Sequence, residues 1–147
     1  MIFEFNTFTI LGRCARTGAL GVATTTGEMA VGSRVPFVAT EVGAVATQAL
    51  TDPRHGPAGL ERLHAGETAT QALDALAASD PHIENRQLAV IDAQGNAAAR
   101  TGADNRDWKG HHIGDGFVAM GNRLTSGAVV DAMAAAFVMP RWRWRSG

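Results

Sequence analysis

The fold is decided at the start of the chain by the stretch NTFTILGRCARTGALGVATTT, residues 6–26. It contains two runs rich in apolar and β-branched residues, 7–14 and 19–26, on either side of the pair Thr17-Gly18. Such runs are typical of β-strands, and a glycine between them favours a tight turn. The stretch therefore predicts a β-hairpin as the first element of the domain.

Two more strands and a helix are predicted after the hairpin. Residues 28–35 and 42–48 are the strand candidates, and their glycines and alanines favour close packing of a neighbouring element. A helix is predicted from Pro57, which suits its first position, to Gly66, which suits its end.

A second helix is predicted from a capping box and a helical pattern of apolar residues. Thr68 and Gln71 have the spacing at which each side chain reaches the other residue's backbone N–H, and Asp80-Pro81 ends the segment. The predicted buried face consists of Ala69, Ala72, Leu73, Leu76 and Ala77.

The last third of the chain predicts strands followed by a helix. The strand candidates are residues 87–92, 97–101 and 117–120, and the polar residues 102–116 are predicted to form a long loop. A helix is predicted over 128–138, with Ser126 as its cap. Its inward face is predicted to hold Val129, Met133, Ala136 and Phe137. This order favours an α+β fold with helices layered on mostly antiparallel sheet.

Composition and charge narrow the class of protein. The 147 residues suit a single domain, and 46% are hydrophobic and 18% charged. Thirteen basic and fourteen acidic residues give a net charge of −1, so we expect neither nucleic acid nor a membrane surface as partner. The single cysteine, Cys14, excludes an intramolecular disulfide. No signal peptide or membrane span is recognisable, which favours the cytoplasm.

Several stretches together resemble the bacterial family called domain of unknown function 1028. They are NTFTILGRCARTGALGVAT, AVGSRVPFV, VGAVATQALTDPRHGPAGLERLHAG, RQLAVIDAQGNAAARTGA and GHHIGDGFVAMGN. The resemblance covers residues 6–138 and implies membership of the Ntn-hydrolase superfamily. It therefore implies an αββα sandwich of mostly antiparallel sheets, whose members hydrolyse amide bonds with a Thr, Ser or Cys at the chain's N-terminus.

The C-terminal end of this sequence departs from the family that it resembles. The family continues beyond the last predicted helix, whereas this sequence ends in RWRWRSG. We therefore expect a single domain over 1–138, incomplete at its C-terminus, and an atypical tail over 139–147.

Thr7 is the candidate nucleophile by its position within the resemblance. Its hydroxyl would attack an amide carbonyl, with its own α-amine as the base. A free α-amine has a pKa near ~8, which suits a base at neutral pH, but it exists only if residues 1–6 are removed. The alternative is an ordinary strand threonine.

Three further residues are candidates for the same site, each with a plainer alternative. Arg34 would supply a positive charge near the nucleophile, or it is a solvated surface residue beside Ser33. Gln48 and Asn122 would donate hydrogen bonds to a developing oxyanion, or they satisfy neighbouring backbone groups. Thr24 and Thr26 are predicted to share one strand face, with Thr25 on the other.

The sequence favours neither a metal nor a cofactor. His111 and His112 with Asp115 resemble a ligand cluster, but adjacent residues of an extended segment point apart, so a solvated loop is the favoured reading. The glycines form no nucleotide-binding motif.

Two functions remain open. The first is an amidohydrolase that acts on a small-molecule or peptide-like substrate. The second is a catalytically inactive relative that binds a small ligand or serves as an assembly subunit. Gly- and Ala-rich strands with uncovered sheet edges favour a homo-oligomer in either case.

Overall fold

The computed structural model describes residues 6–139, and these form an α+β fold with two four-stranded antiparallel sheets. The predicted hairpin is confirmed: β1 (Thr7–Arg13) pairs with β2 (Leu20–Thr25). The first sheet has the order β2-β1-β8-β7, in which β7 is Gly110–Gly114 and β8 is Phe117–Asn122. The expected tail lies outside the described residues, apart from Met139.

The second sheet is built from the middle of the chain. Its order is β3-β4-β5-β6, and each pair of neighbours is antiparallel. Its strands are β3 (Pro36–Ala39), β4 (Gly43–Ala49), β5 (Arg86–Asp92) and β6 (Ala97–Thr101). The helices are α1 (His55–His64), α2 (Ala69–Ser79) and α3 (Ala128–Val138), with short 3-10 turns at Val31–Ser33 and Ile83–Asn85.

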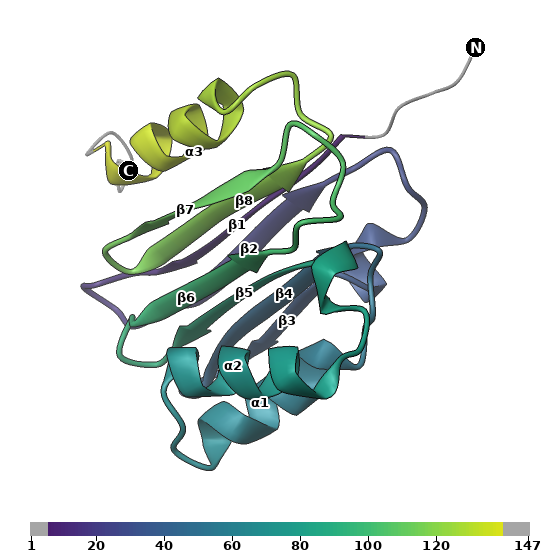
Figure 1. The fold of residues 1–147 in the computed structure, drawn as a ribbon. Coiled ribbons are helices and arrows are strands. Elements are labelled where there is room, and N and C mark those ends of the chain that lie inside the picture. Colours follow the sequence, from purple (N-terminus) through teal and green to yellow (C-terminus); the bar gives the residue numbers. More distant parts are fainter. Residues whose placement is uncertain (1–5, 140–147) are drawn as a thin grey trace.

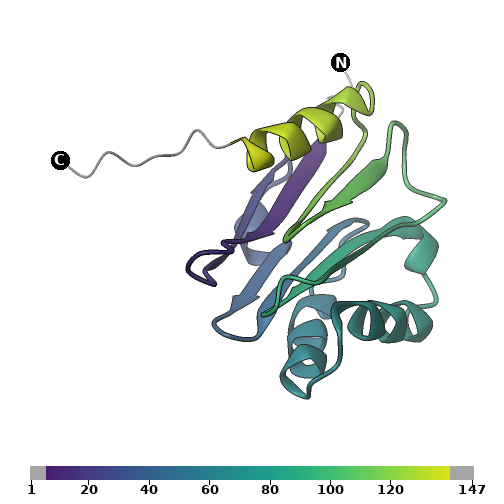
Figure 2. The same ribbon diagram turned by 90° about the vertical axis from the view of Figure 1, so that its left-hand side faces the viewer.

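The elements are arranged in layers. Figures 1 and 2 show α3 on the outer side of the first sheet, the two sheets face to face, and α1 and α2 on the outer side of the second. A fully buried cluster lies between the sheets and combines Leu11 and Met120 of the first with Ala46 and Ile91 of the second. The small alanines of β4 and β5 allow this close approach, as their composition predicts.

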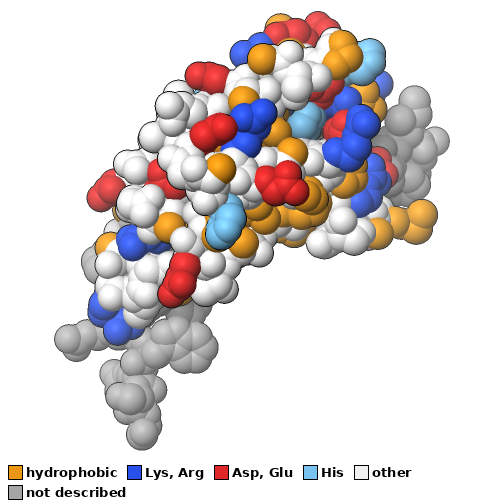
Figure 3. All heavy atoms as spheres, turned by 90° about the horizontal axis from the view of Figure 1, so that it is seen from below, with side chains coloured by type: hydrophobic (Ala, Val, Ile, Leu, Met, Phe, Trp, Pro, Cys, Tyr) orange, Lys and Arg blue, Asp and Glu red, His pale blue; other side chains and the backbone are white. Residues whose placement is uncertain are grey.

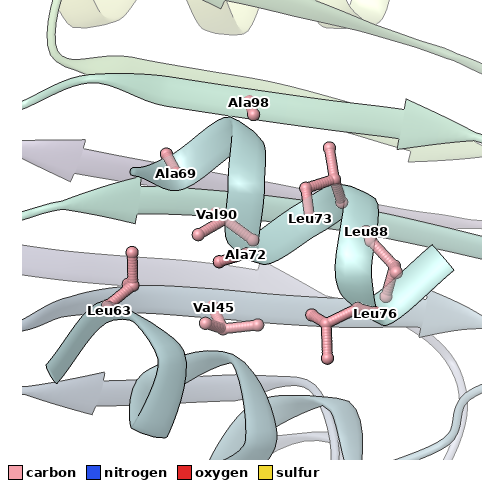
Figure 4. Packing of buried hydrophobic residues seen from close by; sticks show 9 residues of the cluster. All are labelled: Val45, Leu63, Ala69, Ala72, Leu73, Leu76, Leu88, Val90 and Ala98. Carbon is pink, nitrogen blue, oxygen red and sulfur yellow. The ribbon is translucent and has the colours of Figure 1, made fainter. Parts of the chain in front are cut away.

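The layer of α1 and α2 is held by a second apolar cluster. Leu63 of α1 and Leu73 and Leu76 of α2 pack on Val45 and Val90 of the sheet beneath (Figure 4). The predicted capping box is present, because Thr68 accepts from the Gln71 N–H and the Gln71 side chain accepts from the Thr68 N–H. The opposite faces of these helices meet solvent, where acidic, basic and hydrophobic side chains are mixed (Figure 3).

Two of the predicted elements are wrong. Residues 28–35 are not a strand, because Ala30 adopts a left-handed conformation (φ 57°) and a 3-10 turn follows it. The strand begins instead at Pro36, which suits an edge strand because proline lacks the N–H that a central strand must pair. The predicted loop 102–116 contains β7, an edge strand without apolar alternation that pairs along β8.

Helix ends differ in detail from the prediction. Helix α1 begins at His55, so Pro57 is its third residue, still within the first turn where N–H groups have no helical partner. The cap of α3 is Gly127, without a side-chain hydrogen bond, and not Ser126. Its buried residues are Val130 and Ala134, whereas Val129 and Met133 are partly buried and Ala136 and Phe137 are exposed.

Within residues 6–139, no helix combines the length and apolar character that a membrane-spanning helix requires.

Candidate functional site

A polar cavity of about 420 Å³ lies at one end of the two sheets, where several strand ends meet. β1 starts there with Thr7, and β8 ends there with Asn122. β4 ends there with Gln48 and Ala49, and Asn85 precedes β5. The volume falls within the range of small-molecule sites, and antiparallel pairing brings these ends together.

Thr7 contributes a hydroxyl to this cavity. It is 9% exposed, and its Oγ1 donates to Thr26 Oγ1 at 2.9 Å, across the hairpin. Thr9 and Thr24 make the corresponding contact two residues further along, at 2.7 Å. The predicted alternation is therefore present: Thr24 and Thr26 share a face, and Thr25 is exposed on the other.

Gln48 and Asn122 belong to a buried amide network between the sheets. Gln48 accepts from Thr9 Oγ1 (2.5 Å) and donates to Gln87 Oε1 (2.6 Å). Asn122 Nδ2 donates to the same Gln87 oxygen at 3.1 Å. Each amide nitrogen carries two hydrogens, so the bond to Gln87 uses one hydrogen of Gln48 and one of Asn122 and leaves one on each. Both residues also line the cavity.

The cavity carries several charged side chains. Arg34 lines it and is otherwise exposed, and Glu28 lies on the same segment. Arg106 and Arg123 also line it, together with Asp104. None of these five residues forms an ion pair with another side chain of residues 6–139.

Backbone strain is concentrated around this cavity. Ala49 (φ 71°) and Arg123 (φ 53°) line it in the left-handed region, and Ala30 (φ 57°) lies between two lining residues. Non-glycine residues seldom adopt this conformation, and such strain is concentrated at functional sites. The four residues predicted for the site, Thr7, Arg34, Gln48 and Asn122, thus lie around one strained, polar cavity.

Comparison with known protein families places most of this chain in one of them. A sequence model of DUF1028, a family of unknown function, matches residues 7–142. The chain belongs to this family. The crystal structure of a DUF1028 protein from Silicibacter pomeroyi has a TM-score of 0.89 and 36% sequence identity to it. That match covers 92% of this chain and 63% of the other, and no curated protein matches significantly. This chain thus spans 63% of the length of that DUF1028 relative.

A second polar cluster of the DUF1028 domain is buried beside α1. Asp52, His55 and Asp80 bring their ligand-type atoms within 4.8 Å of one another. Arg86 Nε donates to Asp80 at 2.8 Å, and Arg54 donates to Asp52 at 2.6 Å. His55 Nε2 lies 3.2 Å from Asp80. The arginines already neutralise both carboxylates, which makes this a structural charge cluster.

The same contacts shift the pKa values of these groups. The hydrogen bond from Arg54 lowers the pKa of Asp52 well below its usual range. Burial alone would raise the pKa of Asp80, but hydrogen bonds from Arg86 and from the His82 backbone outweigh it and lower that pKa. Burial lowers the pKa of His55 and thus favours the neutral imidazole.

The histidine pair of the predicted loop is divided between two sides of β7. His111 Nδ1 lies 2.8 Å from Thr101 Oγ1, whereas the His112 ring stacks on Phe117 with centroids 5.8 Å apart. The prediction that these side chains point apart is confirmed.

Sequence reasoning missed several residues around the DUF1028 cavity. Arg106 lies in the stretch predicted as loop, and Arg123 lies three residues beyond the end of the predicted strand 117–120. Gln87 lies within a predicted strand, but no local pattern distinguishes a buried amide hub from a surface glutamine. A second cavity, beside α3, is lined by apolar and threonine residues and offers no charged group.

Proposed function

We propose that this DUF1028 chain is an Ntn-type amidohydrolase, with Thr7 as nucleophile, acting on a small or peptide-like amide. The observation that supports it is the shared cavity: Thr7, Arg34, Gln48 and Asn122 come from distant segments and line the same space. The order of layers, with helices outside two face-packed antiparallel sheets, agrees with the αββα arrangement of that superfamily.

The proposed chemistry begins at the Thr7 hydroxyl. Its oxygen attacks the carbonyl carbon of the amide while the Thr7 α-amine takes the hydroxyl proton. The same ammonium returns the proton to the leaving nitrogen, and an ester to Thr7 remains. Water then attacks this ester with the amine again as base, which releases the carboxylic acid and restores Thr7.

The base requires a free amine, so the Asn6–Thr7 bond must be cut. In the chain as written the Thr7 nitrogen is part of a peptide bond, which is no base at neutral pH. Asn6 is exposed and Thr7 lies at the cavity. The bond to be cut therefore lies between an accessible residue and the proposed nucleophile.

The oxyanion would be stabilised by the amides of the site. Asn122 lies directly opposite Thr7 in the sheet and retains one Nδ2 hydrogen beyond its bond to Gln87. Gln48 retains one Nε2 hydrogen in the same way. Amides held in place by Gln87 need no reorganisation as charge develops, which is the condition for effective stabilisation. Arg34 would lower the pKa of the α-amine by its positive charge.

The test compares the chain as written with a chain that begins at Thr7. The second is made as a fusion from which a specific protease leaves Thr7 as first residue. Both are incubated with N-acyl p-nitroanilides that carry neutral, cationic or anionic acyl groups, and intact-mass spectrometry records the N-terminus. We expect hydrolysis and a transient acyl adduct only where Thr7 is the first residue. Absence of both from a folded Thr7 chain would refute the proposal.

A second candidate is a binding protein of the same fold without catalysis. It is favoured by the contact of the Thr7 hydroxyl, which donates to Thr26 in the part of the chain that the structure describes. A threonine engaged in this way stabilises a hairpin end. Ligand binding by both chains without turnover by either would support this candidate.

A further inference from the structure

We propose that Arg106 and Arg123 form a subsite for the carboxylate of the substrate, beside the amide-cleaving centre. The claim that the bound carboxylate belongs to a substrate rests on the proposed function. The claim that the two arginines bind a carboxylate does not. The substrate class is then an amide that also carries a free carboxylate group.

The backbone brings the two arginines together. The Arg123 N–H donates to the Arg106 carbonyl at 3.1 Å, and Leu124 and Trp108 continue the pairing with bonds of 2.9 and 3.0 Å. Both side chains then line the cavity. The segment before β7 and the segment after β8 are therefore held side by side by backbone hydrogen bonds, and both arginine side chains extend from this paired region.

The left-handed conformation of Arg123 directs its side chain. In a regular strand, neighbouring residues point to opposite faces, so Asn122 and Arg123 would not share a site. The φ of 53° at Arg123 breaks this alternation, and both side chains line the same cavity. Since Asn122 is the partner of Thr7 in the sheet, Arg123 lies next to the proposed reaction centre.

The guanidinium groups are available for a ligand. Two acidic residues, Glu28 and Asp104, also line the cavity, but neither forms an ion pair with an arginine among the described residues. Three arginines and two carboxylates leave an excess of one positive charge in the lining. Arg123 is half-buried, which reduces the screening of its charge by water. Arginine binds carboxylates through paired N–H donors, so these two residues suit that group.

The test measures binding of a matched pair of probes to the full chain. N-acetylglycine carries the carboxylate, and N-acetylglycinamide replaces it with a neutral amide. Binding is followed by calorimetry and by amide chemical shifts. We expect N-acetylglycine to bind at least about tenfold more tightly than the amide, and Arg123→Gln or Arg106→Gln to remove most of that difference. Arg62→Gln, whose arginine lies on α1 and pairs with Glu67, is the control and is expected to change nothing.

The outcomes separate this subsite from the proposed function. Thr7→Val should abolish hydrolysis and retain the preference for N-acetylglycine. Carboxylate binding without turnover in any chain would support the subsite and refute the proposed hydrolase activity. Equal binding of the two probes, or an unchanged preference in both arginine variants, would overturn the subsite. Tighter binding of inorganic phosphate would overturn its assignment to carboxylates. If Arg123→Gln does not fold, Arg106→Gln and Arg123→Lys decide the question.

Discussion

Thr7 and Asn122 lie directly opposite each other on β1 and β8, although they come from opposite ends of the described chain. Facing residues on antiparallel strands have Cα atoms about 4.5–5.5 Å apart, so a hydroxyl and an amide share one strand end. A nucleophile and a hydrogen-bond donor in this relationship are what acyl transfer requires.

Replacing the Thr7 hydroxyl tests the nucleophile directly. We expect Thr7→Val to lower amide hydrolysis by roughly a thousandfold or more, because valine keeps the shape and removes the attacking oxygen. Thr7→Ser should retain measurable turnover. Initial rates with the released-Thr7 chain are the measurement, and Thr25→Val, at an exposed position of β2, is the control. A Thr7→Val variant as active as the parent would exclude Thr7 as the nucleophile.

Gln87 is expected to be a major contributor to stability. Its oxygen accepts from Gln48 and Asn122, and its nitrogen donates to Thr101 and to the carbonyls of Gly110 and Gly121. Gln87→Leu removes these hydrogen bonds, and the buried Gln48 and Asn122 amides and the buried Gly121 carbonyl each lose a partner at a cost of about 1–3 kcal/mol. We expect the free energy of unfolding to fall by at least about 3 kcal/mol.

Urea denaturation followed by circular dichroism measures the Gln87 effect. Gln94→Leu is the matched control, since Gln94 is exposed in the turn between β5 and β6 and only its backbone N–H is engaged there. A fall of less than about 1 kcal/mol for Gln87→Leu would show that water replaces the lost bonds.

Gly102 is expected to tolerate no side chain. A Cβ at this position would lie 2.6 Å from the Cα of Glu84 and would also clash with the Glu84 carbonyl, both of them backbone atoms. We expect Gly102→Ala to destabilise the domain by about 1–3 kcal/mol, as overpacking generally does. Gly21→Ala is the control: the position is exposed, nothing lies within 4 Å, and alanine is expected to be neutral or slightly stabilising. Thermal unfolding midpoints that fall equally in both variants would contradict this account.

The stability of the domain is expected to fall below about pH 6.5, the ordinary pKa of histidine. Burial lowers the pKa of His55 in the folded state, so between the two pKa values the unfolded chain binds a proton that the folded chain does not. The stability is therefore complete above the unfolded pKa and is lost as the pH falls, by at most about 1.4 kcal/mol per pH unit for one group. Burial lowers the pKa of His111 as well, but this residue is exposed, so its contribution has the same sign and is reduced by solvent screening.

The measurement is the free energy of unfolding between pH 5 and 8. His55→Gln should reduce the slope in this window, whereas His64→Gln, on the exposed side of the same helix, should retain it. The carboxylates of Asp52 and Asp80 stay ionised here, because their arginine partners lower their pKa values. An unchanged slope in His55→Gln would assign the pH dependence to other groups.

Much of the fold follows from local patterns in the sequence. The hairpin of β1 and β2, the capping box at Thr68 and the strand β5 are encoded by neighbouring residues, through alternation, turn formation and capping. The edge strand β7 and the turn at Val31–Ser33 were predicted wrongly. The strand forms by pairing with β8 and has no apolar alternation, and the turn follows from the left-handed backbone of Ala30, which no apolar pattern indicates.

The sequence by itself determined most of the elements, their mostly antiparallel character and four candidate residues for the site. Thr7 came from its position in the resemblance, and the other three came from their charge or amide chemistry and their place in the chain. Only the tertiary structure decided that these four line one cavity, that Gln87 joins Gln48 to Asn122, and that Arg106 and Arg123 stand beside them. The physical reason is that strand register and sheet stacking bring together residues distant in the chain. Hydrophobic periodicity reports which face of an element is buried, but not which residues meet there.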